Sequence, residues 1–291
     1  MKQAWMFLLL SLSIVSITAF ANDKVIYGED NRLDLFEVTN SLYADLSRST
    51  LALIGKNNIK KVGDEYQISG SPLGTSMQLC AGEKFEKQIT AASCSAFLVT
   101  PKHIVTAGHC VKSLSDCNKY KFVFDFNIGN QNNISYKVDS SSVYGCKALV
   151  AQVLDNSSMD DYAFIELDRE VTDRIPLIVR TEGAVAVKDP LVVIGHPTGL
   201  PAKIADGAVV RSIKNPKYFV TNLDTFGGNS GSAVFNAVTG VVEGILVRGE
   251  TDYQYFGIGK CYKPNYCTET GCRGEDVTRI TNIKKLMDML N

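Results

Sequence analysis

Three short stretches of this chain carry side chains that together could cleave an acyl bond. The first is Gly228-Asn229-Ser230-Gly231, where glycines flank a serine and let the backbone approach a substrate without a Cβ clash. In such a turn the amides of Gly228 and Ser230 could point at one spot and bind the oxygen of a tetrahedral intermediate. Because a serine hydroxyl is unreactive at neutral pH, this hypothesis requires a general base and an acid that orients the base.

The other two stretches offer that base and that acid. His109 follows a β-branched run and a glycine, and Asp161 opens an apolar run. Alternation along that run selects Asp161 over its neighbour Asp160, which we expect to face solvent or to cap the turn. The two remaining histidines, His103 and His196, lie in turns, and we interpret both as structural.

The order His109, Asp161, Ser230 resembles that of the chymotrypsin-like serine peptidases, whereas α/β-hydrolases run Ser, Asp, His and subtilisins run Asp, His, Ser. The resemblance implies that Ser230 attacks a peptide carbonyl while His109 acts as base and then acid, oriented by Asp161. It implies a protein or peptide substrate, and neither a metal nor an organic cofactor. Asn229 resembles the bacterial branch that includes glutamyl endopeptidases, so we expect no animal-style activation by a new N-terminus.

The resemblance also indicates where a substrate side chain would bind. Asp224 lies six residues before Ser230, where trypsin-like members carry the aspartate that pairs with Lys or Arg, and Thr225 follows it. A turn-capping role for Asp224 is the alternative. The expected opposite wall is Val247-Arg248-Gly249, in which Arg248 would neutralise Asp224 or attract an acidic substrate. Val247 stands where relatives have a serine that supports the catalytic aspartate.

The elements that must position these residues read as strands. Short apolar and β-branched runs separated by turn residues predict an all-β protein. The resemblance implies two antiparallel six-stranded β-barrels of the chymotrypsin-like type, with the active site between them. Ile283, Leu286, Met287 and Leu290 recur at helical spacing and predict a C-terminal α-helix. We expect inserts near residues 55–80 and 250–275.

Composition sets the domain organisation and limits the partners. The chain has 291 residues, is 45% hydrophobic and has a formal net charge of −1, so it can bury a large core and has no basic run for nucleic acid. Residues 1–21 are typical of a signal peptide, an uncleaved anchor being the alternative. Residues 22–48 are an N-terminal extension or propeptide. We assign 49–291 to the peptidase domain, with the first barrel at about 49–168 and the second at about 169–291. The predicted protein is secreted or periplasmic and makes no membrane contact after signal cleavage.

Eight cysteines, an even number, predict a disulfide framework in an oxidising compartment. Their spacing does not fit a zinc site. The resemblance implies a disulfide between Cys94 and Cys110, and we expect Cys117 to pair with Cys146. The pairing of the other four, Cys80, Cys261, Cys267 and Cys272, is left open.

The hypothesis is therefore a secreted serine endopeptidase with a preference for Lys or Arg before the cleaved bond. A peptidase that prefers acidic residues is one alternative. A catalytically silent binding domain on the same fold is another, if an insert closes the cleft. An esterase on an α/β-hydrolase scaffold conflicts with the order of the motifs and with the scarcity of helical periods.

Overall fold

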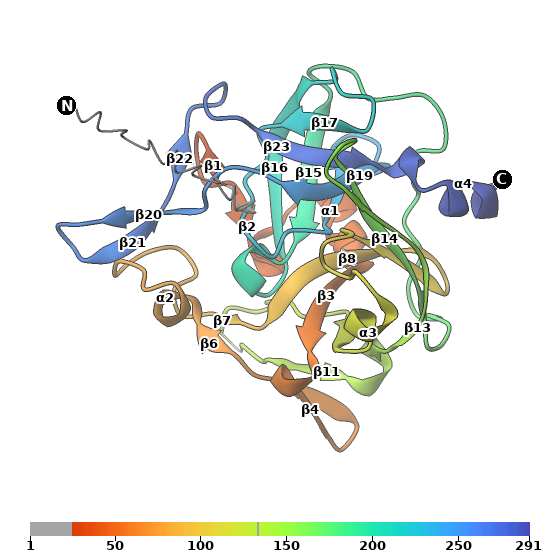
Figure 1. The fold of residues 1–291 in the computed structure, drawn as a ribbon. Coiled ribbons are helices and arrows are strands. Elements are labelled where there is room, and N and C mark those ends of the chain that lie inside the picture. Colours follow the sequence, from red (N-terminus) through yellow and green to blue (C-terminus); the bar gives the residue numbers. More distant parts are fainter. Residues whose placement is uncertain (1–24, 133) are drawn as a thin grey trace, which may run out of the picture.

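The computed structural model describes residues 25–132 and 134–291, and Figure 1 shows two β-sheet bodies side by side. The predicted signal peptide, residues 1–21, lies outside the described residues. Within the described part of the chain, no helix is long and apolar enough to cross a membrane. The two bodies are built from successive halves of the chain, with one exception at the N-terminal side that is described below.

The second body is a closed barrel. Around the sheet its strands are β15 (Pro190–Gly195), β18 (Ala233–Asn236), β19 (Val242–Arg248), β23 (Glu275–Arg279), β17 (Tyr218–Thr221) and β16 (Lys203–Ser212). β15 also pairs with β16, so these six strands form a ring. Apolar side chains such as Val193, Phe219 and Leu246 fill one buried cluster inside it.

The first body is a curled half-barrel. In order across the sheet its strands are β12 (Val143–Tyr144), β10 (Tyr120–Val123), β3 (Thr50–Gly55), β8 (Ala92–Thr100), β9 (His103–Thr106), β14 (Asp160–Leu167) and β13 (Cys146–Asp155). Only Gly145 separates β12 from β13, so one stretch of chain lies at both edges of the sheet. Together with the closed second body, this curled half-barrel matches the predicted chymotrypsin-like fold of two barrels.

The overall class agrees with the sequence: the fold is mostly β and ends in helix α4 (Lys284–Leu290), confirming the prediction of a chymotrypsin-like architecture with a C-terminal helix. Ile283 and Leu286 are fully buried and join the main hydrophobic cluster. The remaining helices are α1 (Ser41–Ser47), α2 (Leu73–Ser76), α3 (Leu114–Cys117) and the 3-10 turns η1 (Leu35–Glu37), η2 (Lys56–Asn58), η3 (Ser140–Ser142), η4 (Pro197–Gly199) and η5 (Ile280–Asn282).

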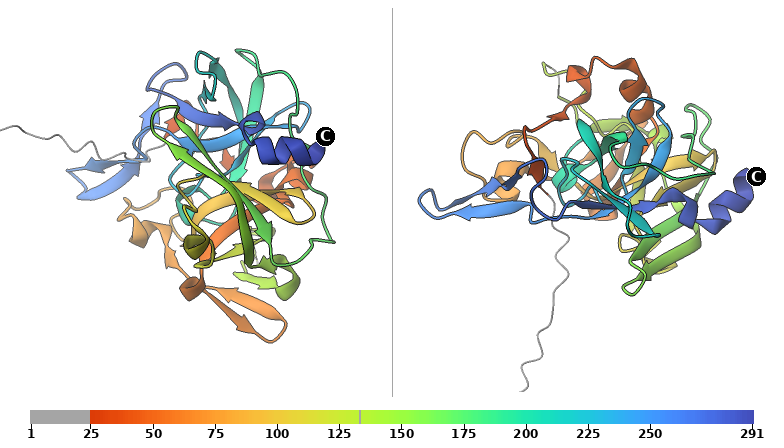
Figure 2. Two further views of the ribbon diagram at one scale, coloured as in Figure 1. Left: turned by 45° about the vertical axis from the view of Figure 1, so that its right-hand side comes forward. Right: turned by 90° about the horizontal axis from the view of Figure 1, so that it is seen from above.

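Short strands form the expected inserts. Within and beside residues 55–80 these are β4 (Ile59–Val62), β5 (Glu65–Ile68), β6 (Ser71–Pro72), β7 (Ile89–Thr90) and β11 (Lys137–Asp139). Within residues 250–275, β20 (Tyr253–Phe256) and β21 (Cys261–Pro264) form a hairpin that projects from the molecule on the side away from α4 (Figure 2). Strand β22 (Tyr266–Cys267) follows this hairpin.

Four disulfides link the described chain, at sequence separations that range from 5 to 181. The structure pairs Cys94 with Cys110, Cys117 with Cys146, Cys80 with Cys261, and Cys267 with Cys272. The Cys80–Cys261 bond ties the insert of the first body to the hairpin of the second. Four disulfides fit an extracellular or periplasmic protein, because such bonds persist in oxidising compartments.

Residues 25–37 precede the first body in sequence but pack on the second. β1 (Ile26–Tyr27) pairs with β22 in parallel, and β2 (Arg32–Leu33) pairs with β16. The Arg32 side chain is fully buried, and its guanidinium lies 4.2 Å from the centre of the Phe226 ring. A buried ion pair adds to this docking, with Lys203 Nζ 2.5 Å from Asp34 Oδ1.

Candidate active site

His109 and Asp161 form a close pair in the first body. His109 lies on the turn that follows β9, and Asp161 lies at the start of β14. The Asp161 carboxylate faces the histidine with both oxygens: Nδ1 of His109 is 2.8 Å from Oδ2, and the His109 backbone amide donates to Oδ1 at 3.0 Å. Asp161 is buried, whereas 15% of the His109 side chain is exposed. A carboxylate on Nδ1 leaves Nε2 as the ring nitrogen available for proton transfer.

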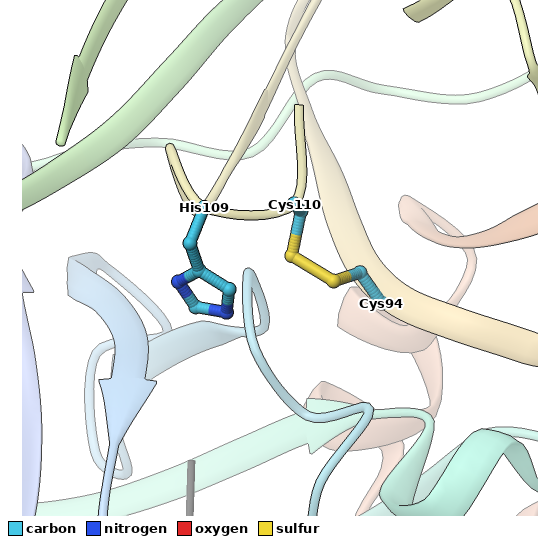
Figure 3. Close-up of side chains that lie close together, drawn as sticks. All are labelled: Cys94, His109 and Cys110. Carbon is cyan, nitrogen blue, oxygen red and sulfur yellow. A yellow bond between two sulfur atoms is a disulfide. The ribbon is translucent and has the colours of Figure 1, made fainter. Parts of the chain in front are cut away.

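A disulfide fixes the turn that carries His109. Cys110 follows His109 and is bonded to Cys94 of β8, and Figure 3 shows the imidazole beside that bond. The ring nitrogens and the two sulfurs are close enough to suggest a metal site. The sulfurs are bonded to each other, so neither is a thiolate that could ligate a metal.

The loop that carries Ser230 lies against this turn. The Ser230 carbonyl accepts a hydrogen bond from the Ser95 amide at 2.8 Å and lies 3.7 Å from Cys110 Sγ. Gly231 has a φ of +89°, and a Cβ there would lie 2.2 Å from Thr106 Oγ1. Only glycine fits this contact, and it brings the serine loop of the second barrel next to the histidine turn of the first.

The backbone before Ser230 has an unusual conformation. Gly228 has a φ of +89°, and its carbonyl accepts a hydrogen bond from Ser95 Oγ at 2.8 Å. This bond holds the carbonyl of the Gly228–Asn229 peptide toward β8. Asn229 is buried, and its Oδ1 accepts a hydrogen bond from Ser232 Oγ at 3.3 Å. The side chain before Ser230 therefore makes a local neutral contact.

Asp224 has a different environment from the substrate pocket considered above. Its Oδ1 accepts a hydrogen bond from the Tyr27 amide at 2.6 Å and its Oδ2 accepts one from the Asn31 amide at 2.9 Å. Burial raises the pKa of Asp224 to about 7, against the effect of the two amide donors, which favour the charged form. Both oxygens thus hold the distant N-terminal segment, which is neither the capping of a local turn nor a contact with substrate.

The predicted opposite wall is also rearranged. Val247 is fully buried, and Arg248 contacts Asp161 and Asp276 instead of neutralising Asp224. Gly249 packs on the carboxylate of Glu275, where a Cβ at position 249 would lie 1.9 Å from Oε2. Oε2 of Glu275 also accepts a hydrogen bond from Thr225 Oγ1 at 2.6 Å.

Sequence reasoning missed Glu275, the carboxylate that touches both Thr225 and Gly249. Nothing local marks it, because an acidic residue at the start of a short strand is an ordinary feature. Asp160 was also misjudged: it is buried, and its Oδ1 accepts a hydrogen bond from Asn282 Nδ2 at 2.8 Å. The other two histidines lie elsewhere, with His103 Nδ1 2.7 Å from Thr100 Oγ1 and His196 Nδ1 3.0 Å from the Leu200 carbonyl oxygen.

The family model of the trypsin-like peptidase domain matches residues 94–245, just over half of the chain. The chain belongs to this family. The matched range of this trypsin-like peptidase contains His109, Asp161 and Ser230. No curated protein matches the chain.

Two solved structures have a similar fold to this trypsin-like peptidase. One is a Glu endopeptidase in complex with MPD, with a TM-score of 0.52 and 14% identity over 91% of this chain and 99% of that one. The other is the VesB protease of Vibrio cholerae, with a TM-score of 0.50 and 13% identity over 90% of this chain and 66% of that one. At such identities the likeness concerns the fold. The family and the fold together support a peptidase.

Proposed function

We propose that this chain is an exported serine endopeptidase that hydrolyses peptide bonds through His109, Asp161 and Ser230. The observation that carries the proposal is the two-point contact between Asp161 and His109, next to the glycine-flanked loop of Ser230. That arrangement supplies an oriented base beside a hydroxyl, which is what acyl transfer to serine requires.

The chemistry follows from these groups. His109 Nε2 takes the proton of Ser230 as Oγ attacks the peptide carbonyl, and the Asp161 carboxylate stabilises the imidazolium that forms. The amides of Gly228 and Ser230 bind the negative oxygen of the tetrahedral intermediate. His109 then gives its proton to the leaving amine, and water hydrolyses the acyl-enzyme by the same steps in reverse. No metal or organic cofactor takes part in this scheme.

The preference at the cleaved bond is part of the proposal. Asp224 holds the N-terminal segment, so we attach the preference for Lys or Arg to Glu275, a fully buried carboxylate that accepts a hydrogen bond from Thr225 and lies against the expected wall residue Gly249. The alternative preference for acidic residues rested on Arg248, whose guanidinium is engaged by carboxylates of the protein. Cleavage of a mixed peptide library by the enzyme and by Glu275→Gln separates the two, because only the first predicts that Gln weakens cleavage after Lys and Arg.

Export and domain boundaries complete the proposal. Residues 1–21 act as a signal peptide, residues 49–291 form the peptidase domain, and the mature protein is secreted or periplasmic. The disulfides support this route, since the cytosol would reduce them. Peptide sequencing of the protein isolated outside the cytosol tests the start of the mature chain and whether residues 22–48 remain attached.

Ser230→Ala is the decisive variant. If the three residues act as a unit, it lowers kcat by about six orders of magnitude, as in another serine peptidase. A fluorophosphonate, which labels activated serines, should react with the wild type at Ser230 and not with the variant. Full peptidase activity in the variant would refute the assignment, and a wild type that neither cleaves peptides nor reacts would favour a silent binding domain.

A further inference from the structure

Arg248 connects the second barrel to the acid of the proposed triad. It is the last residue of β19, and its guanidinium reaches across to the first body. Nη1 lies 3.6 Å from Asp161 Oδ2, the oxygen that faces the His109 ring, and Nη2 donates to the Met159 carbonyl at 2.9 Å. One side chain thus holds both the acid and the turn that precedes it.

The turn before Asp161 needs such support. Met159 has a φ of +64°, in the left-handed region that residues other than glycine rarely adopt. Asp161 itself is 1% exposed, so its charge is screened by protein groups and not by water. The neighbouring Val247 is fully buried, and its aliphatic side chain has no hydrogen-bond donor for Asp161. The contact from this strand to the Asp161 carboxylate therefore comes from Arg248.

The positive charge of Arg248 would by itself destabilise the His109 imidazolium that forms during catalysis. Neighbouring carboxylates must therefore offset this charge. The Arg248 Nε donates to Asp276 Oδ2 at 3.2 Å, and Asp276 is itself buried. Arg273 Nη2 donates to the same oxygen at 2.7 Å, and Arg273 Nη1 donates to the Gly249 carbonyl at 3.0 Å. The charges alternate from Arg273 through Asp276 and Arg248 to Asp161. This alternation lowers the net field at His109 while the guanidinium keeps its fixed position.

We propose that Arg248 is a positioning residue for the triad, which orients Asp161 across the interface of the two barrels and thereby sets kcat. This inference rests on the proposed function. It replaces the role of substrate contact that the sequence suggested for Arg248, and it makes the second barrel contribute to the acid as well as to the nucleophile.

The first test compares steady-state kinetics of the wild type, Arg248→Gln, Arg248→Lys and the control Lys217→Gln. Arg248→Gln should lower kcat about 10- to 50-fold with little change in KM, because Asp161 loses its cationic contact. The kcat of Arg248→Lys should lie between those of the wild type and Arg248→Gln, since Lys keeps the charge but not the planar, forked set of donors. Lys217 Nζ lies 3.3 Å from Asp160, so its loss removes a nearby cation that does not contact Asp161 and should leave kcat unchanged.

The second test asks whether Arg248 acts through Asp161. The rate of fluorophosphonate labelling is measured for Asp161→Asn with and without Arg248→Gln. Positioning predicts that Arg248→Gln changes labelling by less than about two-fold once the carboxylate is absent, whereas a general structural defect would persist in that background. Equal losses in both backgrounds, or a KM effect alone, would overturn the inference. If Ser230→Ala has the same peptidase activity as the wild type, the proposed function itself is refuted.

Discussion

His196 should make the stability of this protein depend on pH. The imidazole is 1% exposed, stacks on Phe126 with ring centres 5.7 Å apart, and its Nε2 has no hydrogen-bond partner among the described residues. Burial lowers the pKa of His196 to about 4 from the model-peptide value of 6.5. The positive charge of Lys203 lowers it further, and the Leu200 carbonyl acts in the opposite direction.

The sign and size of the effect follow by linkage. Above the unfolded-state pKa both states are neutral and the stabilisation is complete. As the pH falls toward 4, the unfolded chain binds a proton that the folded chain excludes. The cost is about 2 kcal/mol of unfolding free energy at pH 5 and approaches about 3 kcal/mol at lower pH. The pKa of Asp224, raised to about 7, acts with the opposite sign, because its stabilisation is lost as the pH rises.

A variant isolates the histidine from that opposing contribution. His196→Asn places an amide donor near the position of Nδ1 and removes the titrating ring. Urea unfolding followed by circular dichroism, in a Ser230→Ala background that prevents self-digestion, gives the unfolding free energy of both proteins between about pH 7 and pH 5. The difference between them should shrink by about 2 kcal/mol across that range. Parallel curves for the two proteins would refute the reasoning, and His196→Gln provides a second variant if His196→Asn does not fold.

Three further perturbations have defined outcomes. Replacing Cys80 and Cys261 by alanine should lower the free energy of unfolding by about 5 kcal/mol, and replacing Cys267 and Cys272 by about 2 kcal/mol. The reason is loop entropy, because the sequence separations are 181 and 5. Equal losses in urea unfolding would contradict this account. Gly231→Ala should abolish fluorophosphonate labelling, because a Cβ there would lie 2.1 Å from the Ser95 carbonyl oxygen. The control Gly63→Ala places its Cβ in open space at a φ of +64°, so it should lower the free energy of unfolding by only about 1 kcal/mol and keep the labelling. Asp224→Asn should cost about 1–3 kcal/mol by leaving one amide of the N-terminal segment without a good acceptor. The same variant should not change the preference seen in a peptide library, and an altered preference would restore Asp224 to the substrate pocket.

The sequence predicted the fold class because its signals are local. Glycines around Ser230, the run that leads to His109 and the order of the motifs can be read from short windows, and so can the helical spacing at the C-terminal end. The pairing of Asp161 with His109 then follows from adjacent strands, since β9 and β14 are neighbours in the sheet.

The parts that could not be predicted depend on contacts between distant residues. Asp224 was judged from its offset to Ser230, but its partners Tyr27 and Asn31 come almost two hundred residues earlier. Arg248 was assigned to a pocket wall because a strand end leaves the direction of a long side chain undetermined.

The docking of residues 25–37 has a consequence for how the molecule can be divided. The second barrel holds β2 against β16 and the Arg32 guanidinium on Phe226, in the loop of the proposed nucleophile. A fragment cut at the crossing between the two bodies would therefore lack part of its own structure, which remains on the other piece. During synthesis these early residues leave the ribosome long before their partner strand exists, so their final burial must be among the last events of folding.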